Sequence, residues 1–149
     1  MGKAQTRSNF CLRVLLCSVM TLCALPLQAK TCTAKQADAA DRQIDQLDSW
    51  IKIDGFIKQF GHCDDGSIAE GASEAVARLL VDQWATLPTL ARLGKRNRNL
   101  MPFVLRHLDA TLDADDLEKI SHLSMAQCPE SVNTLCASLT AQLGKLAKY

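Results

Sequence analysis

The sequence lacks the short motifs that identify the common classes of enzyme. It contains no Gly-x-Ser-x-Gly turn, no glycine-rich phosphate loop, no dinucleotide-binding fingerprint and no His-Glu-x-x-His pair. It also has no Cys-x-x-Cys pair and no His-x-x-x-His pair, which are common spacings of zinc ligands. We therefore expect neither a metal nor a cofactor, and the absences favour a non-catalytic protein over an enzyme.

A membrane-spanning run of apolar residues is also lacking. The apolar run 14–25 has 12 residues, against the roughly 20 that a transmembrane helix needs. It follows Lys3, Arg7 and Arg13 and is followed by Pro26-Leu27-Gln28-Ala29. This order is typical of a secretory signal peptide. We predict a signal peptide over 1–29, cleavage after Ala29, a single helical domain over 30–149 in the periplasm or secreted, and no stable membrane span after cleavage.

The chain has no large excess of charge of either sign, with 17 basic and 16 acidic residues. Three of the basic residues and none of the acidic ones lie in the predicted signal peptide. The remainder is therefore slightly acidic. A nucleic-acid partner is not expected for such a chain, because phosphate backbones bind basic surfaces.

The cysteines that remain after cleavage are even in number. Of seven cysteines, three lie in the signal peptide, which leaves Cys32, Cys63, Cys128 and Cys136. In an oxidising compartment four cysteines predict two disulfides, and three pairings are open. The pairing Cys128–Cys136 is favoured because it spans the break at Pro129 between two helical runs, which leaves Cys32–Cys63 to pin the first helix.

No window of six residues alternates apolar and polar side chains with β-branched character, so no strand is predicted. Apolar residues recur instead at three and four positions. We predict an all-α fold, a compact antiparallel domain of five to six helices stapled by disulfides. The expected helices cover 35–60, 66–84, a short segment ending near Gly94, 99–112, a segment capped by Asp113 and ending at Cys128, and a final one from about Ser131. Trp84 should end the buried stripe of the helix over 66–84.

The most distinctive stretch is the loop from Gly61 to Gly66, which leads into that helix. Asp64 or Asp65 is suited to cap the helix. His62, Cys63 and the two aspartates would also suit a thiolate beside a base, or a hard-metal site with Glu70. However, Cys63 is expected to be oxidised, and the spacing of a calcium-binding EF-hand is absent, so capping is the favoured interpretation.

Three further residues raise the question of catalysis. Glu70 and Glu74 lie one turn apart and would serve as acid and base if their face lined a cleft. Glu74 is also placed to pair with Arg78 four residues later. His107 follows an apolar run and is either a core histidine or a buried partner of Glu70 or Glu74.

Several segments carry a resemblance to known proteins. They are Gly61-His62-Cys63-Asp64-Asp65-Gly66, Ile68-Ala69-Glu70-Gly71, Ser73-Glu74, Arg78-Leu79-Leu80, Trp84, Leu87-Pro88, Phe103-Val104-Leu105-Arg106-His107, Asp116-Leu117 and Cys128-Pro129 to Leu135-Cys136. Together they resemble an uncharacterised family of exported all-helical proteobacterial proteins, to which no activity is attached. Size, export, helix content and cysteine use give a fainter resemblance to the periplasmic immunity proteins that neutralise type VI secretion amidases.

Two hypotheses of function follow. In the first, the chain is a non-catalytic periplasmic protein-interaction protein of the immunity or inhibitor type, whose partner is another periplasmic protein. Its structural or interaction site would include His62, Asp64, Asp65, Glu70, Glu74, Arg78 and His107. In the second, it is a small periplasmic hydrolase or lyase that uses Glu70, Glu74 and His107. The oligomeric state does not follow from the sequence.

Overall fold

The computed structural model describes residues 30–146, so the predicted signal peptide over 1–29 lies outside the described residues. Within this range the structure contains no strand, and the prediction of an all-α fold stapled by disulfides is confirmed. The helices number seven rather than five or six. They are α1 (Ala34–Ile44), α2 (Trp50–Phe60), α3 (Gly66–Asp82), α4 (Leu87–Gly94), α5 (Leu100–Arg106), α6 (Ala114–Ala126) and α7 (Asn133–Leu146), with three 3-10 turns, η1 (Gly61–Cys63), η2 (Trp84–Thr86) and η3 (Glu130–Val132).

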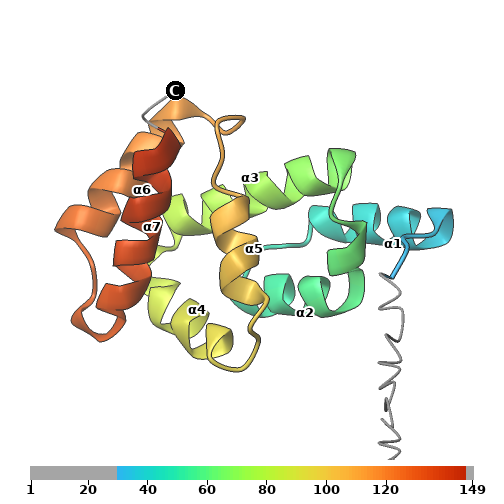
Figure 1. Cartoon of the computed structure of the whole chain (residues 1–149), viewed down its shortest axis with the longest axis horizontal. Coiled ribbons are helices and arrows are strands. Elements are labelled where there is room, and N and C mark those ends of the chain that lie inside the picture. Colours follow the sequence, from blue (N-terminus) through green and yellow to red (C-terminus); the bar gives the residue numbers. More distant parts are fainter. Residues whose placement is uncertain (1–29, 147–149) are drawn as a thin grey trace, which may run out of the picture.

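Helix α3, the longest helix described, joins the two ends of the molecule (Figure 1). It contacts α1 at one end and α6 at the other, while α6 and α7 lie side by side. One cluster of buried apolar residues receives side chains from all seven helices. None of the helices in residues 30–146 is both long enough and apolar enough to cross a membrane.

The apolar stripe of α3 is buried as its spacing predicts. Its members recur at three and four positions and are shielded from water: Ile68, Ala72, Ala75, Val76, Leu79 and Leu80. One polar residue, Ser73, is also buried on this helix. The helix ends at Asp82, two residues earlier than predicted, because the chain turns into η2 at Trp84.

The prediction of one helix over 35–60 is wrong, because the chain breaks between α1 and α2. Ser49 has extended backbone angles, and its side chain accepts a hydrogen bond from the amide of Lys52, which makes it the N-cap of a new helix. Leu47, in the turn, is buried in the core. Gly55 lies inside α2 without interrupting it.

The predicted helix over 99–112 is also too long. Helix α5 ends at Arg106, and Asp109 then organises a turn in which its Oδ1 accepts hydrogen bonds from the amide and hydroxyl of Thr111. Leu108 and Leu112 are nevertheless buried, as their apolar character predicts. A turn therefore places the residues after Arg106 on the core.

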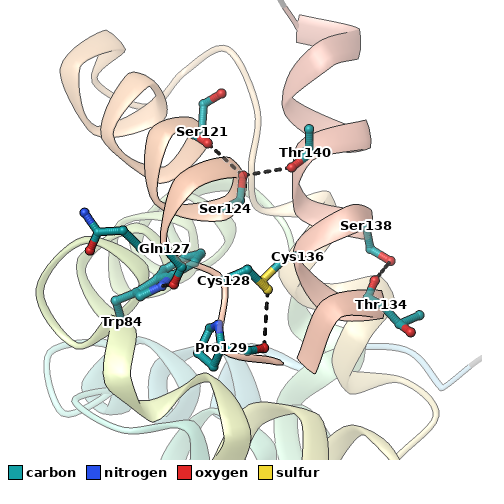
Figure 2. Close-up of a disulfide and its surroundings, with 10 residues drawn as sticks. All are labelled: Trp84, Ser121, Ser124, Gln127, Cys128, Pro129, Thr134, Cys136, Ser138 and Thr140. Carbon is teal, nitrogen blue, oxygen red and sulfur yellow. Dashed lines mark hydrogen bonds between the residues drawn. A yellow bond between two sulfur atoms is a disulfide. The ribbon is translucent and has the colours of Figure 1, made fainter. Parts of the chain in front are cut away.

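Both favoured disulfides are present. Cys32 is joined to Cys63, and Cys128 is joined to Cys136. Figure 2 shows the second bond beside the connection from α6 to α7, where the hydroxyls of Ser124 and Thr140 are also hydrogen-bonded at 2.9 Å. On the chain-entropy argument the two loops contribute about 2.6 kcal/mol for Cys128–Cys136 and about 3.7 kcal/mol for Cys32–Cys63.

The two tryptophans differ in their burial. Trp50 is buried, with 2% of its surface exposed, and its indole N–H donates to the hydroxyl of Thr86 at 2.8 Å. Trp84 is only half-buried, and its indole N–H donates to the carbonyl of Gln127 at 2.8 Å (Figure 2). The prediction that Trp84 ends the buried stripe of α3 therefore needs correction, since it packs on the edge of the core from η2.

We predict that Trp50→Ala destabilises the protein by about 3–5 kcal/mol, because it opens a cavity in the core. Trp84→Ala should cost less, about 1–3 kcal/mol, because part of the ring remains in water and one hydrogen bond is lost. Urea unfolding of the two variants measures both values. A larger loss for Trp84→Ala than for Trp50→Ala would contradict this ranking.

Candidate functional site

The loop between α2 and α3 is fixed by local chemistry. Its Cys63 is bonded to Cys32, which ties the turn to the segment before α1. Asp65 has extended backbone angles and accepts a hydrogen bond from the amide of Gly66 at 2.8 Å. Gly66 has a φ of +53°, in the left-handed region that glycine enters without a Cβ clash. Of the two aspartates that the sequence offered as caps, Asp65 is therefore the N-cap of α3.

Asp64 has a different role, because its side chain lies inside the protein and is only 5% exposed. The guanidinium of Arg106 donates to its Oδ2, and Nε2 of His107 lies 3.1 Å from Oδ1 and 3.2 Å from Oδ2. Burial raises the pKa of Asp64, but the hydrogen bonds and charges of His107 and Arg106 outweigh it and hold the pKa below its ordinary value. Asp64 is thus a buried carboxylate at neutral pH.

His107 connects this carboxylate to α3. Its Nδ1 lies 2.8 Å from the hydroxyl oxygen of Ser73, and that hydroxyl donates to the carbonyl of Ala69 at 3.1 Å. Because a hydroxyl has one proton, Ser73 can then only accept from the ring. With Nε2 directed at Asp64, His107 joins α3 to the loop before it through both of its ring nitrogens.

Aromatic packing fixes the same two side chains from α5. The rings of Phe103 and His107 have centroids 4.1 Å apart, and the guanidinium of Arg106 lies 5.4 Å from the centroid of Phe103. Such a cation above an aromatic face is attracted by the ring. The Asp64 network, which we define as Asp64, Ser73, Arg106 and His107, is therefore held by packing as well as by hydrogen bonds.

The structure does not bring Glu70, Glu74 and His107 together. Glu70 lines a hollow of about 240 Å³ with His107, but Glu74 lines a different hollow, with Arg78. Among residues 30–146, no hydrogen bond or ion pair joins either glutamate to His107. The expected ion pair between Glu74 and Arg78 is likewise not formed in this part of the chain.

The hollow that Asp64, Ser73 and His107 line also has an acidic rim. Asp65, Glu70, Asp109 and Thr111 line it, together with Arg106, whose side chain is 56% exposed. Its volume of about 240 Å³ is smaller than the roughly 300 Å³ at which pockets for drug-sized ligands begin. We call these five residues the acidic rim. They form a shallow charged surface rather than a deep cleft.

His62 lies elsewhere, although it is close to Asp64 in the sequence. Its half-buried ring lines another hollow, together with Lys58 and Arg106. Its Nε2 is buried and has no hydrogen-bond partner among the described residues. Of the candidate residues, the structure thus joins Asp64 with His107 and places Asp65 and Glu70 beside them. It separates His62, Glu74 and Arg78 from this group.

Sequence reasoning missed Ser73 and Arg106 as members of the site. Ser73 lies 34 residues before its partner His107, so only the fold brings them together. One signal was present, because Ser73 adjoins Ala72 in the apolar stripe, and a polar residue at a buried position requires a partner. Arg106 carried no comparable signal, since most arginines at the end of a helix face solvent.

The described part of the chain, residues 30–146, contains no group of three or more His, Cys, Asp or Glu side chains placed to hold a metal ion. Comparisons with protein-family models, with curated proteins and with solved structures found no match. The geometry of the site therefore has to carry any argument about function.

We predict that Asp64→Asn destabilises the protein by about 3 kcal/mol near neutral pH, because Arg106 and His107 lose their buried anion. The folded pKa of Asp64 lies below the unfolded value of 3.8. Its stabilising effect is therefore fully present above the unfolded pKa and is lost as the pH falls through the folded pKa. The difference between wild type and variant should shrink on acidification from about pH 5 to about pH 2.

Urea unfolding across this pH range measures the difference. Asp48→Asn is the matched control, because Asp48 also pairs with a cation, Lys52, but is exposed. It should have no measurable effect. The assignment of Asp64 as a buried, stabilising carboxylate would be contradicted if Asp64→Asn did not destabilise the protein near pH 7. It would also be contradicted if the destabilisation grew as the pH fell.

Proposed function

We propose that this chain is a non-catalytic periplasmic protein of the immunity or inhibitor type, which binds another protein through the acidic rim. The observation that carries the proposal is the Asp64 network. Asp64 and its partners fix the loop before α3 to α5 from inside, while Asp65 and Glu70 are exposed and Asp109 is half-buried at the same hollow.

A surface of this kind is suited to recognition because it is held in place before the partner arrives. The Cys32–Cys63 disulfide, the Asp65 cap and the Asp64 network each restrain the same short loop. Binding to a preorganised surface avoids the entropy cost of ordering it. Three carboxylates against one guanidinium favour a partner with a basic surface, since complementary charge speeds association and excludes wrong partners.

The same network supports a role without catalysis. Ser73 is 4% exposed and its hydroxyl proton is used by Ala69, so it is poorly placed to attack a substrate. Both ring nitrogens of His107 are already engaged, Nδ1 with Ser73 and Nε2 with Asp64, and the charge of Asp64 is already balanced by Arg106.

The compartment and the class of partner rest on the sequence. The predicted signal peptide supports export, and the two disulfides are compatible with an oxidising compartment. The resemblance in size, helix content and cysteine use to immunity proteins against type VI secretion amidases supports a secreted or periplasmic enzyme as the partner. Several segments that carry the family resemblance also contribute a residue to the site, among them those that contain Asp64, Ser73 and His107.

The proposal predicts that Glu70→Lys abolishes capture of the partner while the protein remains folded. The test is cross-linking and affinity capture from periplasm, with the captured protein then purified and its Kd measured. Reversal of one charge in the rim should weaken binding by about 100-fold, because it replaces an attraction with a repulsion. Glu118→Lys is the matched control, because Glu118 is also the fifth residue of its helix and is also exposed.

Equal binding by wild type and Glu70→Lys, or loss of binding only in Glu118→Lys, would contradict a site at the acidic rim.

The enzyme hypothesis is tested with the same preparations. If the purified wild type cleaves peptidoglycan or glycan fragments, and the folded double variant Glu70→Gln with Glu74→Gln loses about 100-fold of that activity, a hydrolase replaces the binding protein.

A further inference from the structure

The hollow that His62 lines, between the end of α2 and α5, has basic groups in its wall. It has a volume of about 400 Å³, and Lys30, Lys58, His62 and Arg106 contribute to its wall. None of the described residues that line it is acidic. We call it the basic hollow. It contrasts with the acidic rim, although Arg106 lines both.

The acids that balance these cations lie behind them in the protein. Asp54, whose side chain is 9% exposed, accepts a hydrogen bond from Lys58 at 2.5 Å, and Asp64 accepts one from Arg106. Neither acid lines the basic hollow. An ammonium has three N–H donors and a guanidinium has five, so each buried carboxylate fixes its cation and leaves further donors.

Nothing else in the described part of the chain takes up these donors. Lys58 and Arg106 each make a hydrogen bond to their buried aspartate and to no other residue among 30–146. The ring of His62 on η1 lines the same hollow, and its buried Nε2 has no hydrogen-bond partner among the described residues. Buried polar atoms normally find a partner, so this atom is an unexplained feature of the same hollow.

We propose that the basic hollow binds an oxyanion, a phosphate or carboxylate group, with Lys58 and Arg106 as the charged donors. An oxyanion has acceptors and no donors, which matches a wall of ammonium and guanidinium groups. The volume exceeds that of a single ion, and Ile57, Pro102 and Phe103 supply apolar wall for the body that carries the anionic group. The inference does not depend on the proposed protein partner, because it concerns the isolated chain.

The test is an NMR titration of the full mature protein. Chloride is added so that the ionic strength stays the same throughout the titration. Two probes are used. One is inorganic phosphate, and the other is N-acetylglutamate with its α-carboxyl group converted to an amide, so that the side-chain carboxylate is its anionic group. Saturable binding should shift the amide signals of Gly61, His62 and Arg106. Lys58→Gln should raise the Kd about tenfold, as expected for loss of one charge-assisted hydrogen bond.

Lys52→Gln is a closely matched control. Lys52 lies on the same helix and pairs with Asp48 four residues earlier, as Lys58 pairs with Asp54, but it does not line the hollow. Its loss should change the Kd by no more than about twofold. If Lys58→Gln fails to fold by circular dichroism, Lys30→Gln takes its place.

The outcomes separate the sources of the anion. Binding of phosphate alone assigns the hollow to a phosphate group, and binding of the glutamate probe assigns it to a carboxylate such as an acidic side chain. Either result supports the proposal. The absence of saturable shifts, or equal weakening by Lys58→Gln and Lys52→Gln, would overturn it, because the latter shows only general screening of charge.

Discussion

The structure around α3 depends on the buried carboxylate of Asp64. A carboxylate that leaves water is stable only if its charge is paired and hydrogen-bonded. Asp64 meets this condition through Arg106 and His107, which the chain supplies more than 40 residues later. Because the same histidine also contacts Ser73, the carboxylate joins the loop, α5 and α3 in a single set of contacts. The loss of Asp64 would leave both Arg106 and His107 without their shared anion.

A second buried carboxylate fixes the segment that leads into α5. Asp54 of α2 accepts hydrogen bonds from Lys58 and from the side chain of Asn97, which is itself buried. Burial raises the pKa of Asp54, but these hydrogen bonds outweigh burial and hold the pKa below its ordinary value. The basic loop over 95–99 is therefore anchored at its centre. A helix as short as α5 has little stability of its own. The contact of Asn97 just before it and those of Arg106 and His107 at its end explain how it keeps a fixed position.

The sequence was sufficient to predict the parts of the fold that follow from the spacing of apolar residues, from helix caps and from the number of cysteines. The buried stripe of α3, the Asp113 cap and both disulfides were predicted, since each depends on residues near one another in the chain or on the count of cysteines. The break at Ser49 was not, because an apolar stripe continues through it and a serine cap is a weak signal within such a stripe. The partners of His107 were not predicted either, because hydrogen bonds between side chains depend on the packing of helices far apart in the sequence.

Arg106 shows why a buried anchor and an exposed charge have to be distinguished when function is assigned. Arg106 belongs to the acidic rim and also lines the basic hollow, and Asp64 pairs with its guanidinium from inside. A change at Asp64 would therefore disturb both surfaces and the fold together, so loss of function in such a variant would not identify either site. Glu70 lines only the acidic rim and Lys58 only the basic hollow. A change at Glu70 leaves the Asp64 network intact and so reports on the acidic rim alone. Lys58→Gln also removes the hydrogen bond to Asp54, so a loss of binding in that variant is assigned to the basic hollow only once circular dichroism shows that it folds.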